Sequence, residues 1–131
     1  MVDMSIRVVR LGSAREPGEG LRIGTVRRPP RGVPKEEFAS RDYYDVWLPE
    51  LSPSQELVSA ALHAETEREW ASFVRGYRKE MSSPAARHLL DLLAALSHRT
   101  ELAVGCYCED ERRCHRSLLG QLLADAGAEL A

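Results

Sequence analysis

Short runs of alternating apolar and polar residues fill the first third of the chain and predict strands separated by loops. The β-branched runs at 5–11 and 21–26 predict two strands, and the aromatic run at 43–48 predicts a third. The glycine-rich stretch 12–20 and the proline-rich stretch 27–35 fit neither strand nor helix, so both are expected to be loops.

Apolar residues at helical spacing follow. Ser52 begins a capping-box pattern with proline at the first helical position, and Thr66 begins a second, so a helix is expected after each. Ser83 and Pro84 open a third helix. The apolar face of the second helix is expected to hold Trp70, Phe73, Val74, Tyr77 and Met81. The buried stripe of the third is expected to hold Leu89, Leu90, Leu92, Leu93 and Leu96.

The last thirty residues predict a strand and then a helix. Residues 101–108 are apolar and β-branched, and a leucine-rich helix follows Cys114 and stops near Gly127. Strands at the start and a helix–helix–strand–helix order at the end predict an α/β fold. We expect one compact three-layer domain over residues 1–131, with a small, mostly parallel sheet flanked by helices.

Composition narrows the classes of function. The net charge of −2 argues against a protein that binds polyanions by its overall field, so contact with nucleic acid needs a local basic patch. Three cysteines cannot all pair within one chain, and the segment MVDMSIRVVRLG lacks the apolar stretch of a signal peptide. We therefore expect a cytoplasmic protein with reduced thiols and no membrane contact. Nothing in the sequence indicates an oligomeric state.

All three cysteines gather in the segment CYCEDERRCHR. Cys106 and Cys108 extend the apolar face of the predicted strand toward its carboxyl end, where open α/β sheets bind ligands. The turn that follows brings Cys114, His115 and Arg116 to a helix N-terminus. Such a terminus attracts anions and lowers the pKa of thiols.

Four interpretations of this segment stay open. A zinc site would use Cys106, Cys108, Cys114 and His115. However, strand residues two apart lie roughly 6.5 Å apart, zinc-bound sulfurs roughly 3.8 Å apart, and adjacent helical residues point in different directions. A phosphatase-like Cys-x5-Arg cradle from Cys106 to Arg112 would contain three acids that repel an anion. The others are a metal-free thiol site, with Cys108 or Cys114 as the thiolate and His115 as acid or base, and simple core packing. We expect no cofactor, with zinc or iron as the alternative.

The proline-rich loop is the second candidate site. It carries four cations, Arg27, Arg28, Arg31 and Lys35. Arginine recognises phosphate or carboxylate through paired hydrogen bonds. If strand 21–26 runs parallel to strand 101–108, this loop and the Cys-His-Arg turn leave the sheet at the same edge.

We expect an enzyme-like pocket there for a small anionic molecule or nucleotide. Arg28, Arg31 and Arg116 would bind the anion, Asp45 would orient an arginine, and Trp47 would form a stacking wall. The rival function is a non-catalytic module that binds a nucleic-acid backbone or a protein through the basic loop. The loop arginines could instead form a solvated surface paired with Glu36, Glu37 and Glu50.

Four segments resemble the domain-of-unknown-function 488 family, in particular its short single-domain branch. They are CYCEDERRCHRSLL, YYDVWLPELSPS, EWASFVRGYRKEM and RRPPRGVPK, and the resemblance runs from about residue 5 to residue 127. It implies a compact α/β fold, and the family's activity is not established. The motif residues that carry over are Cys106, Cys108, Cys114, His115, Arg116, Arg28, Pro30, Arg31, Gly32, Trp47, Leu48 and Pro49. Many members of the short branch lack the strand-end cysteines. This favours the proline-rich loop at 27–35, which we call the arginine loop, over the cysteines as the functional site that the branch shares.

Overall fold

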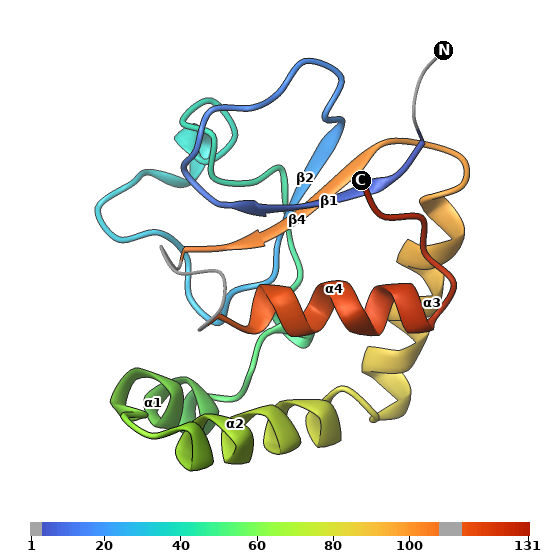
Figure 1. Ribbon diagram of the computed structural model, residues 1–131. Helices are drawn as coiled ribbons and strands as arrows, with labels where there is room; N and C mark the ends of the chain where they lie inside the picture. The colour runs from blue at the N-terminus through green and yellow to red at the C-terminus, as the bar shows by residue number, and fades with distance from the viewer. Residues whose placement is uncertain (1–3, 108–113) are drawn as a thin grey trace.

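The computed structural model describes residues 4–107 and 114–131, so Cys108 and Arg112 lie outside the described residues. It confirms the predicted α/β class: four parallel strands form one sheet in the order β1-β4-β2-β3 (Figure 1). The strands are β1 (Ile6–Arg10), β2 (Leu21–Gly24), β3 (Val46–Trp47) and β4 (Leu102–Cys106). The two 3₁₀ turns are η1 (Lys35–Glu37) and η2 (Pro49–Leu51). The helices are α1 (Gln55–His63), α2 (Glu67–Glu80), α3 (Pro84–Leu96) and α4 (His115–Asp125).

Local side-chain chemistry sets the helix boundaries. Thr66 and Ser83 are N-caps as predicted, each accepting a hydrogen bond from a backbone amide three residues on. The first helix begins later than expected, with Ser54 as its N-cap, because Ser52 is already used as the C-cap of η2. Gly127, at φ +99°, ends α4 as predicted. None of the described helices is both long and apolar enough to cross a membrane.

The main core lies between the sheet and the helices, which all lie on one side of the sheet in Figure 1. α4 packs directly against β1 and β4. The buried face of α3 is centred on Ala86, Leu90 and Leu93. Leu92 points to solvent, and its predicted burial is wrong because it lies on the opposite side of that helix. The core includes Ile6, Ile23, Leu51, Phe73, Tyr77, Met81, Leu102, Val104, Leu118, Leu119 and Leu123.

Loops rather than helices cover the other face of the sheet and form the third layer. Tyr44 is buried there, and its ring lies so close to Gly24 that a Cβ at that position would collide with it. This use of Tyr44 explains why the predicted third strand, 43–48, shortens to β3. The chain turns at Asp42, whose φ is +63°, and Tyr44 packs against Phe38 before pairing with β2 begins.

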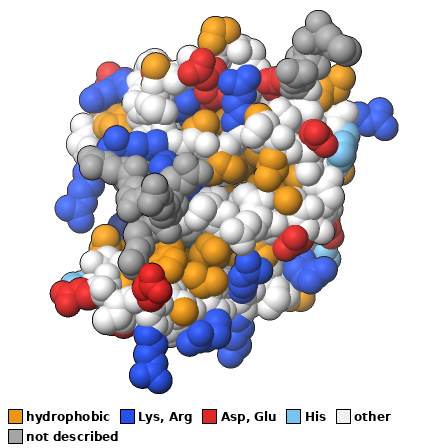
Figure 2. Space-filling model, in the orientation of Figure 1, with side chains coloured by type: hydrophobic (Ala, Val, Ile, Leu, Met, Phe, Trp, Pro, Cys, Tyr) orange, Lys and Arg blue, Asp and Glu red, His pale blue; other side chains and the backbone are white. Residues whose placement is uncertain are grey.

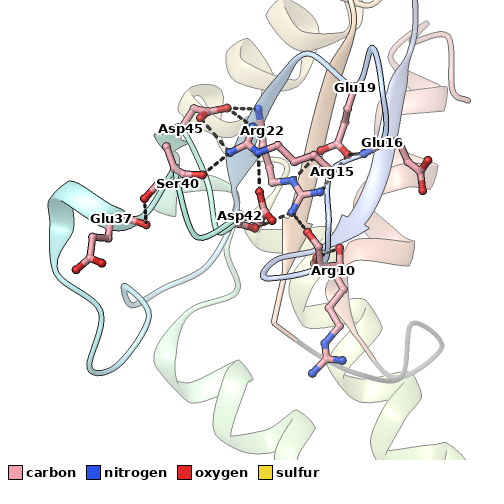
Figure 3. Close-up of polar contacts among 11 residues, drawn as sticks. Arg10, Arg15, Glu16, Glu19, Arg22, Glu37, Ser40, Asp42 and Asp45 are labelled. Atoms are coloured by element: carbon pink, nitrogen blue, oxygen red, sulfur yellow. Dashed lines mark hydrogen bonds and ion pairs between the residues drawn. The ribbon is translucent and has the colours of Figure 1, made fainter.

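A fully buried arginine, Arg22 of β2, holds this loop layer to the sheet (Figure 3). Its Nε and Nη2 donate to the two carboxylate oxygens of Glu19, at 2.7 and 3.0 Å. Its Nη1 donates to the carbonyl oxygens of Ser13 at 2.8 Å and Asp42 at 2.7 Å. One guanidinium therefore ties two loops to the sheet, and the sequence analysis did not predict it.

Replacing Arg22 with methionine is expected to destabilise the protein strongly, because Glu19 would keep a buried charge without its partner. Removing one member of a buried ion pair costs about 3–5 kcal/mol, and we expect a loss of that order in the free energy of unfolding in urea. The matched control is Arg15→Met, which removes a partly exposed pair with Asp45 and should cost about 1 kcal/mol or less. Equal losses in the two variants would contradict this role for Arg22.

Acid should weaken the same layer. Burial alone would raise the pKa of Glu19, but hydrogen bonds from Arg22 and the Glu16 amide hold it below its usual 4.5. The unfolded chain therefore binds this proton first, so the stability that Glu19 contributes is present above pH 4.5 and is lost as the pH falls further. In urea titrations from pH 7 to about 3, Glu19→Gln should flatten the acid slope relative to wild type. An unchanged slope would contradict the assignment.

Candidate functional site

The arginine loop and the Cys-His-Arg turn do meet at one edge of the sheet. β2 and β4 pair in parallel, with Gly24 opposite Gly105, so both strands end on the same side. β1 also runs parallel to β4 and ends there at Arg10. In Figure 2, several Lys and Arg side chains lie on the left of the view, the side where β4 ends in Figure 1, and others lie along its lower edge.

An open pocket of about 420 Å³ lies at this edge. Among the described residues, three arginines and two tyrosines contribute to its wall, and no carboxylate does. Its lining residues are Arg10, Leu11, Arg28, Pro29, Pro30, Arg31, Tyr43 and Tyr107. We call it the arginine pocket. Of the predicted ligand-binding residues, Arg28 and Arg31 line it.

Tyr107, directly after β4, positions the wall of the arginine pocket. Its hydroxyl donates to the Arg28 carbonyl oxygen at 2.9 Å, and its own carbonyl accepts from Nε of Arg10 at 3.3 Å. Its ring meets Tyr43 edge-on, with the ring centres 6.2 Å apart. Burial, together with the nearby Tyr44 and Tyr43, raises the pKa of the Tyr107 phenol, so it stays a hydrogen-bond donor. The arginine loop is thus tied to the strand end.

The loop arginines are used differently. Arg27 turns away from the arginine pocket and donates to the carbonyl oxygens of Pro53 and Ser52, at 3.1 and 3.2 Å. Arg28 reaches only Oε1 of Gln55, at 3.4 Å, and Arg31 has no hydrogen-bond or ion-pair partner among the described residues. Within residues 4–107 and 114–131, none of the three is paired with the acids at 36, 37 or 50. So far as the described residues show, the guanidinium groups of Arg28 and Arg31 remain available to a ligand.

A second group, which we call the thiol–imidazole cluster, consists of Cys106, Cys114 and His115. All three are buried, and their sulfur and ring-nitrogen atoms lie within 4.8 Å of one another. The structure joins Cys106 and Cys114 as a disulfide across Cα atoms 7.7 Å apart. Nδ1 of His115 lies 3.9 Å from Sγ of Cys114.

Hydrogen bonding fixes the tautomer of His115. Its Nε2 lies 2.7 Å from the carbonyl oxygen of Thr25, which can only accept, so Nε2 carries the proton. Burial lowers the pKa of His115 to about 4; the bond to Thr25 opposes this shift, and the charge of Arg116 adds to it. The ring is therefore neutral near pH 7, with the lone pair of Nδ1 on the side of Cys114.

The closeness of Cys114 and His115 corrects one expectation. Adjacent residues on a helix point in different directions, but Cys114 is the N-cap of α4 and has extended backbone, with φ −129° and ψ 149°. Only His115 is helical. The change of backbone between them turns both side chains toward the end of β4, so the geometric objection to shared ligation fails for this pair.

Arg116 is buried at the start of α4, with 5% of its surface exposed. Its Nε and Nη1 have no hydrogen-bond partner in the described parts of the chain. Neither Arg116 nor His115 is among the residues lining the arginine pocket. The expected convergence of Arg28, Arg31, His115 and Arg116 on one cavity is thus not seen: two line the pocket and two are buried beside it.

Asp45 and Trp47 also lie outside the arginine pocket. Asp45 does orient an arginine, but this is Arg15, which donates to its two carboxylate oxygens at 2.8 and 3.1 Å. Asp45 also accepts from the Arg22 amide, so it belongs to the loop layer. Trp47 donates from Nε1 to the carbonyl oxygen of Val26 at 2.7 Å, which fixes the ring against the β2 exit.

The sequence analysis missed Arg10, Tyr43 and Tyr107 as pocket residues. Arg10 ends β1 and Tyr107 follows β4, so both occupy the carboxyl ends of neighbouring parallel strands. Their position at strand ends could have indicated that Arg10 and Tyr107 line a pocket. The prediction would also have required the strand order β1-β4-β2, because this order decides which strand ends lie next to the arginine loop.

Comparison with known proteins places the chain in a family. The DUF488-N3a family model, whose description is the active DUF488-N3 subclade, matches residues 6–127. No curated protein and no solved structure matches the chain. The match covers both strands that flank the candidate site, the arginine loop and α4. The chain belongs to the DUF488 family.

Proposed function

We propose that the arginine pocket binds a small molecule bearing a phosphate or carboxylate group, such as a nucleotide. The observation that carries this proposal is the wall of three arginines and two tyrosines at the carboxyl edge of a parallel sheet, to which none of the described carboxylates contributes. This edge is where open α/β sheets bind their ligands. Arg28 and Arg31 offer forked donors that match an oxyanion.

Size and composition support a small ligand. A volume of about 420 Å³ lies within the range of small-molecule sites. Tyr43 and Tyr107 add apolar ring surface beside the cations, as recognition of a base or another planar group requires. Pro29 and Pro30 stiffen the loop, so less conformational entropy is lost when the arginines close on a ligand.

The matched subclade is described as active, and we propose that the arginine pocket is the ligand site of an enzyme. Cys114 and His115, the expected nucleophile and acid or base, are buried outside the pocket lining, and Cys108 lies outside the described residues. A catalytic role for these three stays a prediction. The binding proposal rests on the arginines alone.

Salt dependence separates this function from its rival, a module that binds a nucleic-acid backbone. A protein that covers Z phosphates of a single strand loses affinity with a slope of about −0.7Z in log–log plots against salt. Only a few cations line the arginine pocket, so a mononucleotide should bind with a shallow slope and compete with inorganic phosphate. Tight binding of single strands with a steep slope would favour the nucleic-acid module.

Changing Arg31 to glutamine should weaken the binding of inorganic phosphate or a mononucleotide about tenfold in calorimetric titrations, since one charge-assisted hydrogen bond is worth about 1.5 kcal/mol or more. Arg99→Gln is the matched control. It removes the same charge from an exposed position just before β4, at the opposite edge of the sheet. Equal affinity in the Arg31 variant and wild type would refute the arginine pocket as the anion site.

Arg116→Met should leave the free energy of unfolding in phosphate-free buffer unchanged or raise it. Two buried guanidinium nitrogens without partners carry a desolvation cost that no hydrogen bond offsets, and methionine fills a similar length without that cost. The contrast with Arg22→Met is the internal control, since both arginines are buried and, in the described part of the chain, Nε and Nη1 hydrogen-bond in Arg22 but not in Arg116. A loss of several kcal/mol for Arg116→Met would show that this charge already has a partner in the folded protein.

A further inference from the structure

Two cysteine sulfurs, joined as a disulfide in the structure, and one imidazole meet in the interior where β4 ends and α4 begins. Cys106 is the last residue of β4, Cys114 is the N-cap of α4, and His115 is its first residue. Their potential ligand atoms lie within 4.8 Å of one another, close enough for all three to contact one ion. We propose that Cys106, Cys114 and His115 bind a zinc-class divalent metal ion that clips the strand to the helix.

The orientation of His115 supports this proposal. A metal-binding histidine uses one ring nitrogen for the ion and donates the other N–H to a carbonyl or carboxylate. Here Nε2 donates to the Thr25 carbonyl oxygen at 2.7 Å, and Nδ1 faces the sulfur of Cys114. The ring of Tyr77, centred 5.5 Å away and inclined at 61°, packs against the imidazole and helps to hold it.

Backbone spacing favours a shared ion over a disulfide. The Cα atoms of Cys106 and Cys114 are 7.7 Å apart. Disulfides hold Cα atoms roughly 4.4–6.8 Å apart, and a pair beyond about 7 Å needs backbone movement to be bridged. A metal ion between two sulfurs adds two bonds of about 2.3 Å to the span, so it suits the wider separation.

Ligand chemistry selects the class of metal. Two sulfurs and an imidazole nitrogen suit zinc and related thiophilic ions, whereas magnesium and calcium require oxygen ligands. A thiol reductant first supplies the two electrons and two protons that convert the Cys106–Cys114 disulfide to two thiols. Binding then forms two metal–sulfur bonds and one metal–nitrogen bond, and the two thiol protons leave to solvent. Two thiolates and one divalent cation sum to zero, so the buried site carries no net charge. A tetrahedral ion takes one more ligand than the three that the described residues supply.

The site is separate from the arginine pocket, since none of its three residues lines that pocket. The two proposals can therefore fail independently. Loss of phosphate binding in Arg31→Gln reports on the pocket, and metal content with thiol protection reports on the cluster.

The test begins with the full chain purified under mild reductant and without chelator. We expect about one equivalent of zinc by elemental mass spectrometry, and at least two thiols that a thiol reagent labels only after a chelator is added. Thiols that label only after stronger reductant, in a protein whose mass is lower by two hydrogens, would establish a disulfide and overturn the proposal. Thiols that label at once in metal-free protein would overturn it as well.

Variants assign the ligands. In zinc titrations against a chromophoric chelator, Cys106→Ser, Cys114→Ser and His115→Gln should each weaken zinc binding by more than the roughly 100-fold that loss of an outer hydrogen bond can cost. His63→Gln is the matched control, because His63 is exposed on α1 and bonds only the Ser59 carbonyl among the described residues. Affinity at the wild-type level in all three cluster variants would overturn the assignment.

Cobalt substitution keeps the proposal testable if those variants fail to fold. Wild-type protein loaded with Co²⁺ should show the intense visible bands of four-coordinate cobalt, together with sulfur-to-metal charge transfer in the near ultraviolet. Weak bands typical of six oxygen or nitrogen ligands, without charge transfer, would overturn the proposal. This spectroscopic test requires no variant.

Discussion

The buried pair of Arg22 and Glu19 is the interaction on which the second face of the sheet depends. A parallel sheet must be covered on both faces, and here the helices cover only one. The other cover is made of loops, which bury a second apolar cluster that includes Leu11, Val26 and Tyr44. One guanidinium with four hydrogen bonds fixes these loops to the sheet, because it binds a carboxylate and two carbonyl oxygens from two loops (Figure 3). Tyr44 then packs on Gly24 and closes the layer.

The strand order and this loop layer together form the edge of the sheet where the arginine pocket lies. β4 lies between β1 and β2, so three parallel strands end side by side, followed by Leu11, Thr25 and Tyr107. Tyr107 joins the outer two, accepting from Arg10 on one side and donating to Arg28 on the other. The loop layer fixes the remaining wall, since Tyr43 follows the Asp42 carbonyl that Arg22 binds. The arginine pocket is thus a consequence of the sheet and its cover together.

The sequence predicted best those features that depend on neighbouring residues. The caps at Thr66 and Ser83, the Gly127 stop and the Phe73–Tyr77 helix face follow from spacing over a few residues, and the structure has all of them. Parallel pairing of β2 with β4 was assumed, and from it the shared edge followed. Arg22 was missed because its partners come from two separate loops, and the arginine that Asp45 orients, Arg15, could not be named for the same reason. The extended backbone of Cys114 was also missed. Because Cys114 is the N-cap and lies outside the helix, its side chain points toward that of His115 rather than away from it.

Arg22 and Arg116 are two buried arginines in different environments. Both are buried, at 0% and 5% exposure, yet among residues 4–107 and 114–131 only Arg22 of the two has its charge balanced by a carboxylate. A buried cation without hydrogen bonds costs stability, and a protein keeps such a group when another interaction offsets the cost. At the start of α4, Cys114 lies two residues before Arg116 and would supply such an interaction when it is deprotonated. Thiolates at Cys114 and Cys106 would place negative charge beside it, and the N-terminus of the helix favours that charge further. We infer that the charge of Arg116 favours the thiolate form of the reduced cysteines before metal binds, which is the form that the proposed metal ion binds.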